Sequence, residues 1–125
     1  MHHPIIPLII SSKEKRTAQT EGLLDSGSDG IVIPRGIADY LGLELTPAER
    51  PMMVANGRSV KRFTSRATLT LGRGGRHCDP IEAEVSVPAE GNPPILIGRE
   101  PIFRLFTITF VEAERRFEMK PYRNG

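Results

Sequence analysis

Short apolar runs separated by turn-forming residues make up most of the chain. Residues 81–87 alternate between apolar and polar side chains, as expected of a strand with one buried face, and residues 67–71 do the same. Residues 95–97 are apolar without alternation, which predicts a strand buried on both faces. The composition of other runs predicts further strands at residues 7–10, 17–24, 31–33, 107–111 and 116–120. The pattern therefore favours an all-β chain.

Two stretches depart from the strand pattern. In residues 36–43, Ile37, Tyr40 and Leu41 have helical spacing and Gly42 provides a stop, which predicts a short helix. Residues 101–106 begin with a proline, which is well placed in the first turn of a helix, and they predict a second short helix.

A hairpin is predicted near the middle of the chain. Residues 51–55 and 58–63 resemble strands, and Asn56-Gly57 lies between them. Asn-Gly is typical of a type I′ turn, because both of its central residues need a positive φ. By itself this pattern fits an ordinary connecting hairpin as well as a hairpin with a functional role.

The main candidate for chemistry is the loop Asp25-Ser26-Gly27. It follows an apolar strand-like run that ends at Leu24, and a second such run begins at Ile31. The loop therefore leaves the core with a carboxylate at its first position. Gly27 lacks a side chain, so that another chain or a ligand can approach its backbone closely.

Four interpretations of this loop compete. A calcium loop fits Asp25 and Asp29, but Gly27 offers no ligand at the third position and Gly36 stands where the bidentate glutamate is needed. A serine nucleophile elbow needs glycine where Leu24 stands. The others are an aspartyl site, with Asp25 as the reacting carboxylate, and a plain structural turn.

A second motif, Ile95-Leu96-Ile97-Gly98-Arg99-Glu100, favours the aspartyl site. With it, the chain resembles the retropepsin-like aspartic proteases, in which an apolar pair and Asp-[Ser/Thr]-Gly are followed later by an apolar run, Gly-Arg and a short helix. The resemblance extends over about residues 5–121. The helix-like residues 36–42 and a charged tail differ from the viral members, which favours a cellular, microbial relative.

The resemblance implies a fold. We expect a closed, mostly antiparallel acid-protease barrel with one or two short helices, present as a homodimer. Residues 1–125 are expected to form one domain, and the hairpin at about residues 51–63 is expected to be a flap over the substrate.

The chemistry explains why a dimer is expected. Hydrolysis of a peptide bond without a metal needs a base that activates water and an acid that protonates the substrate. Two carboxylates that share one proton supply both. The chain contains a single Asp-Ser-Gly, so the second Asp25 must come from a second copy across a two-fold axis. The resemblance assigns Ser26 a hydrogen bond across the interface and Gly27 a close approach to substrate or to the partner loop.

The resemblance also predicts how substrate binds. An extended peptide is expected between the flap and the cleft floor. Arg99 is expected to pair with Asp29, while Gly98 lets its strand pass near the Asp25 loop. Apolar pockets are predicted at Ile31, Ile33, Met53, Val54 and Ile102, and the full set of substrate-binding residues is Asp29, Ile31, Val54, Ala55, Asn56 and Gly57.

Composition and charge narrow the possible partners, cellular compartment and cofactors. The 125 residues suit one domain, and 17 basic against 15 acidic residues, a net charge of +2, predict no nucleic-acid or membrane partner. A single cysteine excludes an internal disulfide and, with no apparent signal peptide or membrane span, favours the cytoplasm. His2, His3 and His77 are not spaced as metal ligands, so neither metal nor cofactor is expected.

The sequence leads to the hypothesis of a homodimeric aspartic endopeptidase with a peptide or protein substrate. One alternative is the same fold without effective catalysis, used for dimerisation or peptide binding. Another is a small β-barrel in which Asp-Ser-Gly is only a turn. Residue types alone do not separate them, because catalysis depends on geometry.

Overall fold

Strands account for most of the elements in the computed structural model. The structure describes residues 5–13, 16–25, 27–53, 57–72, 78–103, 106–111 and 116–121. The elements in chain order are β1 (Ile5–Ser11), β2 (Thr17–Leu24), β3 (Ile31–Val32), α1 (Arg35–Leu41), β4 (Thr46–Pro47), β5 (Met52–Met53), β6 (Ser59–Val60), β7 (Arg62–Leu71), β8 (Ile81–Pro88), β9 (Leu96–Ile97), η2 (Arg99–Phe103), β10 (Phe106–Val111) and β11 (Arg116–Pro121).

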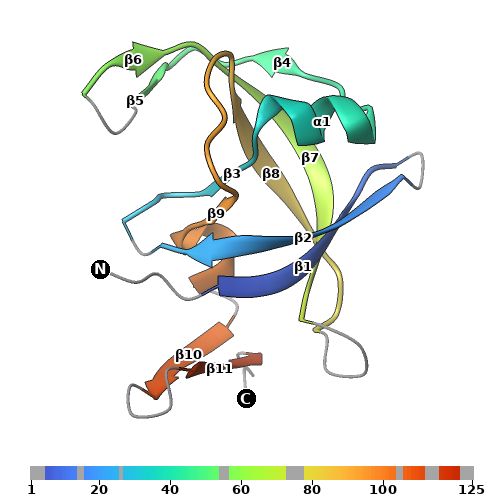
Figure 1. The fold of residues 1–125 in the computed structure, drawn as a ribbon, viewed down its shortest axis with the longest axis vertical. Helices are drawn as coiled ribbons and strands as arrows, with labels where there is room; N and C mark the ends of the chain where they lie inside the picture. The colour runs from blue at the N-terminus through green and yellow to red at the C-terminus, as the bar shows by residue number, and fades with distance from the viewer. Residues whose placement is uncertain are drawn as a thin grey trace.

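A closed barrel forms the body of the molecule (Figure 1). Its strands follow the order β1-β2-β9-β3-β8-β7, and β1 also pairs with β7, so the six-stranded sheet closes on itself. The β2–β9 and β3–β8 pairings are parallel and the others in the barrel are antiparallel. β4 adds an antiparallel pairing to β7. The predicted closed, mostly antiparallel all-β fold is confirmed.

Alternation along the strands fills the barrel with apolar side chains. In β8, Ala83 and Val85 are buried while Glu82 and Glu84 are exposed, as the pattern predicted. Each fully buried Val, Leu or Ile side chain contributes about 1.5–3 kcal/mol relative to an exposed one. The largest fully buried side chains are Leu8, Ile10, Ile31, Ile33, Leu41, Leu69, Leu71, Val85, Val87, Ile97 and Ile102.

Each of the two short helical segments follows a short barrel strand, α1 after β3 and η2 after β9. α1 buries Ala38 and Leu41 and ends at Gly42, whose φ of 69° is left-handed and favours glycine. η2 begins at Arg99, two residues before the predicted start of the second helix, and it is interrupted at Glu100, whose backbone is extended. The predicted helix over residues 101–106 was wrong at its end, because β10 has begun by residue 106.

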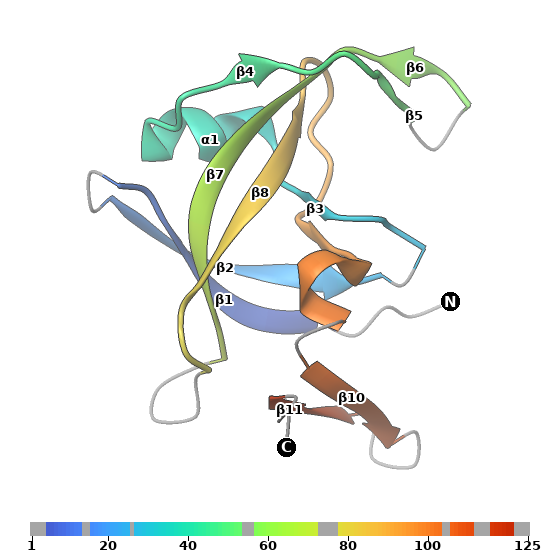
Figure 2. The same ribbon diagram turned by 180° about the vertical axis from the view of Figure 1, so that it is seen from behind.

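Two hairpins lie outside the barrel, at opposite ends of the molecule (Figures 1 and 2). In one, Met52 pairs with Val60 and Met53 with Ser59, so the strands of the predicted central hairpin do pair. Its turn residues 54–56 lie outside the described residues, and the type I′ turn stays a prediction. The other hairpin joins β10 to β11, as predicted. In the described part of the chain no helix is long and apolar enough to cross a membrane.

Candidate active site

Backbone pairing with the second motif positions Asp25 at the end of β2. The Leu23 N–H donates to the Ile95 carbonyl oxygen at 2.8 Å, and the Asp25 N–H donates to the Ile97 carbonyl oxygen at 3.0 Å. These bonds continue the parallel pairing of β2 with β9. Because β9 pairs with both β2 and β3, the end of β2 that carries Asp25 is held by the barrel backbone.

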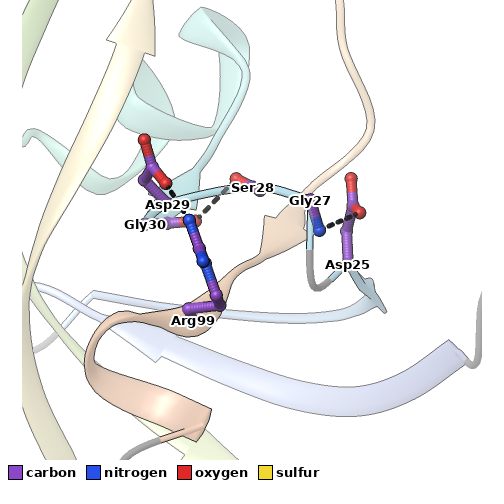
Figure 3. Close-up of polar contacts among 6 residues, drawn as sticks. All are labelled: Asp25, Gly27, Ser28, Asp29, Gly30 and Arg99. Carbon is purple, nitrogen blue, oxygen red and sulfur yellow. Dashed lines mark hydrogen bonds and ion pairs between the residues drawn. The ribbon is translucent and has the colours of Figure 1, made fainter.

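The Asp25 carboxyl group is held within its own loop (Figure 3). The Gly27 N–H donates to Oδ1 of Asp25 at 2.9 Å, and the Ser28 N–H donates to the Asp25 carbonyl oxygen at 3.1 Å. The described residues supply no hydrogen bond to the other carboxyl oxygen of this half-buried side chain. One carboxyl oxygen is therefore oriented by the loop backbone. Ser26 lies outside the described residues, and its role stays a prediction.

The Gly98-Arg99 motif packs directly against this loop. The N–H groups of residues 98, 99 and 100 donate to the carbonyl oxygens of residues 30, 28 and 29 at 3.0, 2.9 and 2.9 Å. A Cβ atom built on Gly98 lies only 2.5 Å from the Gly30 carbonyl oxygen and overlaps the Ser28 carbonyl group. The close approach predicted for Gly98 is therefore present, and it leaves no space for a side chain.

An ion pair joins the same two segments. Nη2 of Arg99 lies 2.6 Å from Oδ1 of Asp29, as the sequence led us to expect (Figure 3). The two side chains are 59% and 93% exposed. An exposed pair of this kind contributes at most about 1 kcal/mol to stability because water screens it. The backbone bonds therefore hold the loop more firmly than the ion pair does.

A cleft of about 920 Å³ begins at Gly27, two residues beyond Asp25, and extends to residues 50–53 at the start of the β5–β6 hairpin. Of the predicted substrate-binding residues, Asp29 and Ile31 line it and Gly57 does not. Val54, Ala55 and Asn56 lie outside the described residues. Their assigned roles in binding stay predictions.

Part of the predicted apolar lining was wrong. Ile33 and Ile102 are completely buried in the core and offer no surface to a ligand, whereas Met53 is 71% exposed and lines the cleft. Polar and charged side chains on the outward faces of β7 and β8 line it instead, and sequence reasoning missed them. The alternation of both strands indicated that these side chains face outward, but not that they face a cleft. They are Arg62, Arg66, Glu82, Glu84 and Ser86.

Cys78 is expected to react slowly with alkylating reagents at neutral pH. Burial and the neighbouring Asp79 carboxylate raise the pKa of the thiol, and the reactive form is the thiolate. The rate of iodoacetamide modification should therefore rise at a higher pH than for an exposed cysteine. Asp79→Asn should move that rise to lower pH, and a fully reactive Cys78 at neutral pH would contradict this assignment.

The barrel, the carboxylate loop at its end and the Gly-Arg segment packed on that loop together define an acid-protease type of structure. The aspartyl protease family matches residues 13–100, and the chain belongs to this family. A search of curated proteins gave no significant match.

Solved structures share the fold. EIAV protease in complex with the inhibitor HBY-793 is similar with a TM-score of 0.61 and 21% identity, over 83% of this chain and 88% of that one. A retropepsin-like aspartic protease from Rickettsia conorii is similar with a TM-score of 0.55 and 15% identity, over 89% of each chain. The resemblance to retropepsin-like proteases is thus confirmed for family and fold.

Proposed function

We propose that the protein is a homodimeric aspartic endopeptidase. The observation that carries this proposal is the Asp25 loop, in which the Gly27 N–H orients one carboxyl oxygen and backbone bonds to residues 95 and 97 position the end of β2. The chain has one such loop, so a second carboxylate has to come from a second copy. A residue beside a two-fold axis meets its own equivalent, and a symmetric dimer therefore completes the pair.

The chemistry follows from two adjacent carboxyl groups that share one proton. The ionised group accepts a proton from water as the water oxygen attacks the scissile carbonyl carbon. The protonated group donates to the carbonyl oxygen. The carboxyl group that took the proton from water then donates it to the peptide nitrogen, and the other carboxylate accepts a hydroxyl proton of the tetrahedral intermediate as the C–N bond breaks. Because the pair reacts as a unit, neither role belongs permanently to one subunit.

Substrate is proposed to lie extended in the cleft between residues 27–32 and the β5–β6 hairpin, which acts as the flap. Extended peptides bind through main-chain hydrogen bonds, with alternate side chains entering pockets. A segment within a longer protein chain is proposed to enter this cleft, as an endopeptidase requires. The flap tip is proposed to close over this segment.

The test is cleavage of an unfolded protein over a range of pH and protein concentration. Specific activity should rise with concentration as dimers form, and a statine-type inhibitor should abolish it. An active monomer would contradict the shared pair of carboxylates. Dimers that cleave nothing at any pH would favour the alternative, a dimerisation or peptide-binding module.

A further inference from the structure

The end of the cleft beside the β5–β6 hairpin contains a guanidinium that forms no ion pair with any residue the structure describes. Arg62, at the start of β7, is half-buried and lines the cleft. Its Nε donates to the Arg50 carbonyl oxygen and its Nη1 to Oγ of Ser86, both at 2.9 Å. Both acceptors are neutral, and none of the ion pairs among the described residues involves Arg62. The side chain is therefore fixed in place while its charge is not neutralised.

The hydrogen bonds of Arg62 leave a defined binding edge. A guanidinium has five N–H donors in a planar fork. Arg50 and Ser86 take two of them, so that three remain, including both on Nη2. An edge formed by Nη1 and Nη2 matches the two oxygens of a carboxylate, which arginine binds through two parallel hydrogen bonds.

The acidic residues of the cleft are mostly committed to other cations. Asp29 pairs with Arg99, and Oε1 of Glu82 lies 3.0 Å from Nε of Arg66. Glu84 is the direct cross-strand partner of Arg66. Asp29 and Glu82 are therefore each paired with a cation, while Glu84 shares its neighbour Arg66 with Glu82.

The arginines at the end of the cleft beside the β5–β6 hairpin differ from these paired residues. Arg50 lines the same end as Arg62 and is exposed. Glu100 belongs to the segment that packs on the Asp25 loop, where its N–H donates to the Asp29 carbonyl oxygen. Neither Arg50 nor Arg62 takes part in an ion pair with another described residue, so a ligand that places a carboxylate beside them gains an attraction that a neutral ligand lacks.

The position of Arg62 determines which part of a peptide it can meet. Ser86, to which it is bonded, is the register partner of Val32 on β3, seven residues beyond Asp25. An extended peptide advances about 3.3 Å per residue, so a bound peptide reaches this end with a side chain some residues away from the cleaved bond. Selection at Arg62 therefore acts at a distance from the catalytic carboxylates.

We propose that Arg62, supported by Ser86 and Arg50, forms a subsite for an acidic side chain of the substrate. The protein would then select segments that carry aspartate or glutamate near, but not at, the bond that is cut. This inference rests on the proposed function in that the cleft must bind a peptide, but it does not require cleavage.

Binding to the inactivated Asp25→Asn protein tests the subsite separately from catalysis. Fluorescent peptides that bind are compared in pairs with glutamate or glutamine at each position in turn. At one position, glutamate should bind about tenfold more tightly, as expected for a charge-assisted contact in a partly buried site. Adding Arg62→Gln should remove this difference.

Two further variants serve as controls. Lys61→Gln removes the same charge from an exposed neighbour that does not line the cleft, and it should retain the full preference. Arg50→Gln, at an exposed position, should weaken the preference without the risk to folding that a change at half-buried Arg62 carries. Peptides ending in an amide or a free carboxylate show whether a chain terminus, rather than a side chain, occupies the subsite.

Each outcome has a defined meaning. Cleavage without any preference for glutamate, or a preference that persists in the Arg62→Gln protein, would overturn the subsite and leave the protease proposal intact. A preference lost with Arg62 in a protein that cuts nothing would retain the subsite and reject the protease. Absence of all peptide binding and all cleavage would reject both.

Discussion

Replacing Asp25 by asparagine is expected to lower the rate of peptide cleavage by about 10⁴-fold, because the amide can neither accept a proton from water nor take part in a shared-proton pair. The fold should be retained, since the asparagine carbonyl oxygen can still accept the hydrogen bond from Gly27 that now reaches Asp25 Oδ1. The measurement is initial rate on a peptide substrate, together with circular dichroism and a thermal melt. Activity that survives the change would remove the aspartyl mechanism.

Mixing the Asp25→Asn and unchanged proteins gives a sharper result. If both carboxyl groups are needed, random pairing of equal amounts leaves about a quarter of the dimers active, whereas independent subunits would retain about half of the activity. The two proteins should be equilibrated at low concentration before concentration and assay, so that subunits exchange. A linear dependence of activity on the fraction of unchanged protein would contradict the shared site.

Replacing Gly98 by alanine is expected to reduce the free energy of unfolding by about 3 kcal/mol and to abolish cleavage. The added methyl group meets the carbonyl groups of Ser28 and Gly30, which belong to the backbone and cannot rotate away as a side chain could. The hydrogen bonds between residues 98–100 and 28–30 must then lengthen, and the Asp25 loop moves with them. Urea unfolding measures the stability, and the peptide assay measures the activity.

Gly36→Ala is the matched control for Gly98. Gly36 lies in α1, and a Cβ atom built there has nothing within 4 Å. The same substitution should stabilise the protein by about 0.5–1 kcal/mol, because alanine is the better helix former. A Gly98→Ala protein as stable and active as the Gly36→Ala protein would show that the Gly-Arg segment does not support the loop.

Local patterns in the sequence predicted most of the strands, and they predicted which face of a strand is buried. The alternation of residues 81–87 identified β8 and its buried positions. The apolar run at residues 95–97 correctly indicated a strand, but burial on both faces was only partly right, because Ile95 and Ile97 are buried while Leu96 is half-buried. Boundaries were less accurate. Residues 58–63 read as one strand but are divided between β6 and β7, because periodicity does not show where a chain changes its pairing partner.

The Asp25 loop could be recognised from the sequence because its residues are chemically distinctive. Asp-Ser-Gly after an apolar run, and Gly-Arg after another, led to the Asp29–Arg99 pair, which the structure contains. The residues that line the cleft could not be predicted from the sequence in the same way. Ile33 was expected to line a substrate pocket but is buried in the core, and Arg62, to which the sequence assigned no role, lines the cleft.

The amino-acid sequence by itself indicated the class of fold and the family, and it led to the expectation of a second copy of Asp25, because these inferences depend on residue types and local spacing. Only the tertiary structure decided that β9 lies between β2 and β3, that Gly98 has no space for a side chain, and which charges surround the cleft. An alternating pattern tells which side chains leave the core. What they meet outside depends on strands distant in sequence, whose pairing is settled by the closure of the whole barrel.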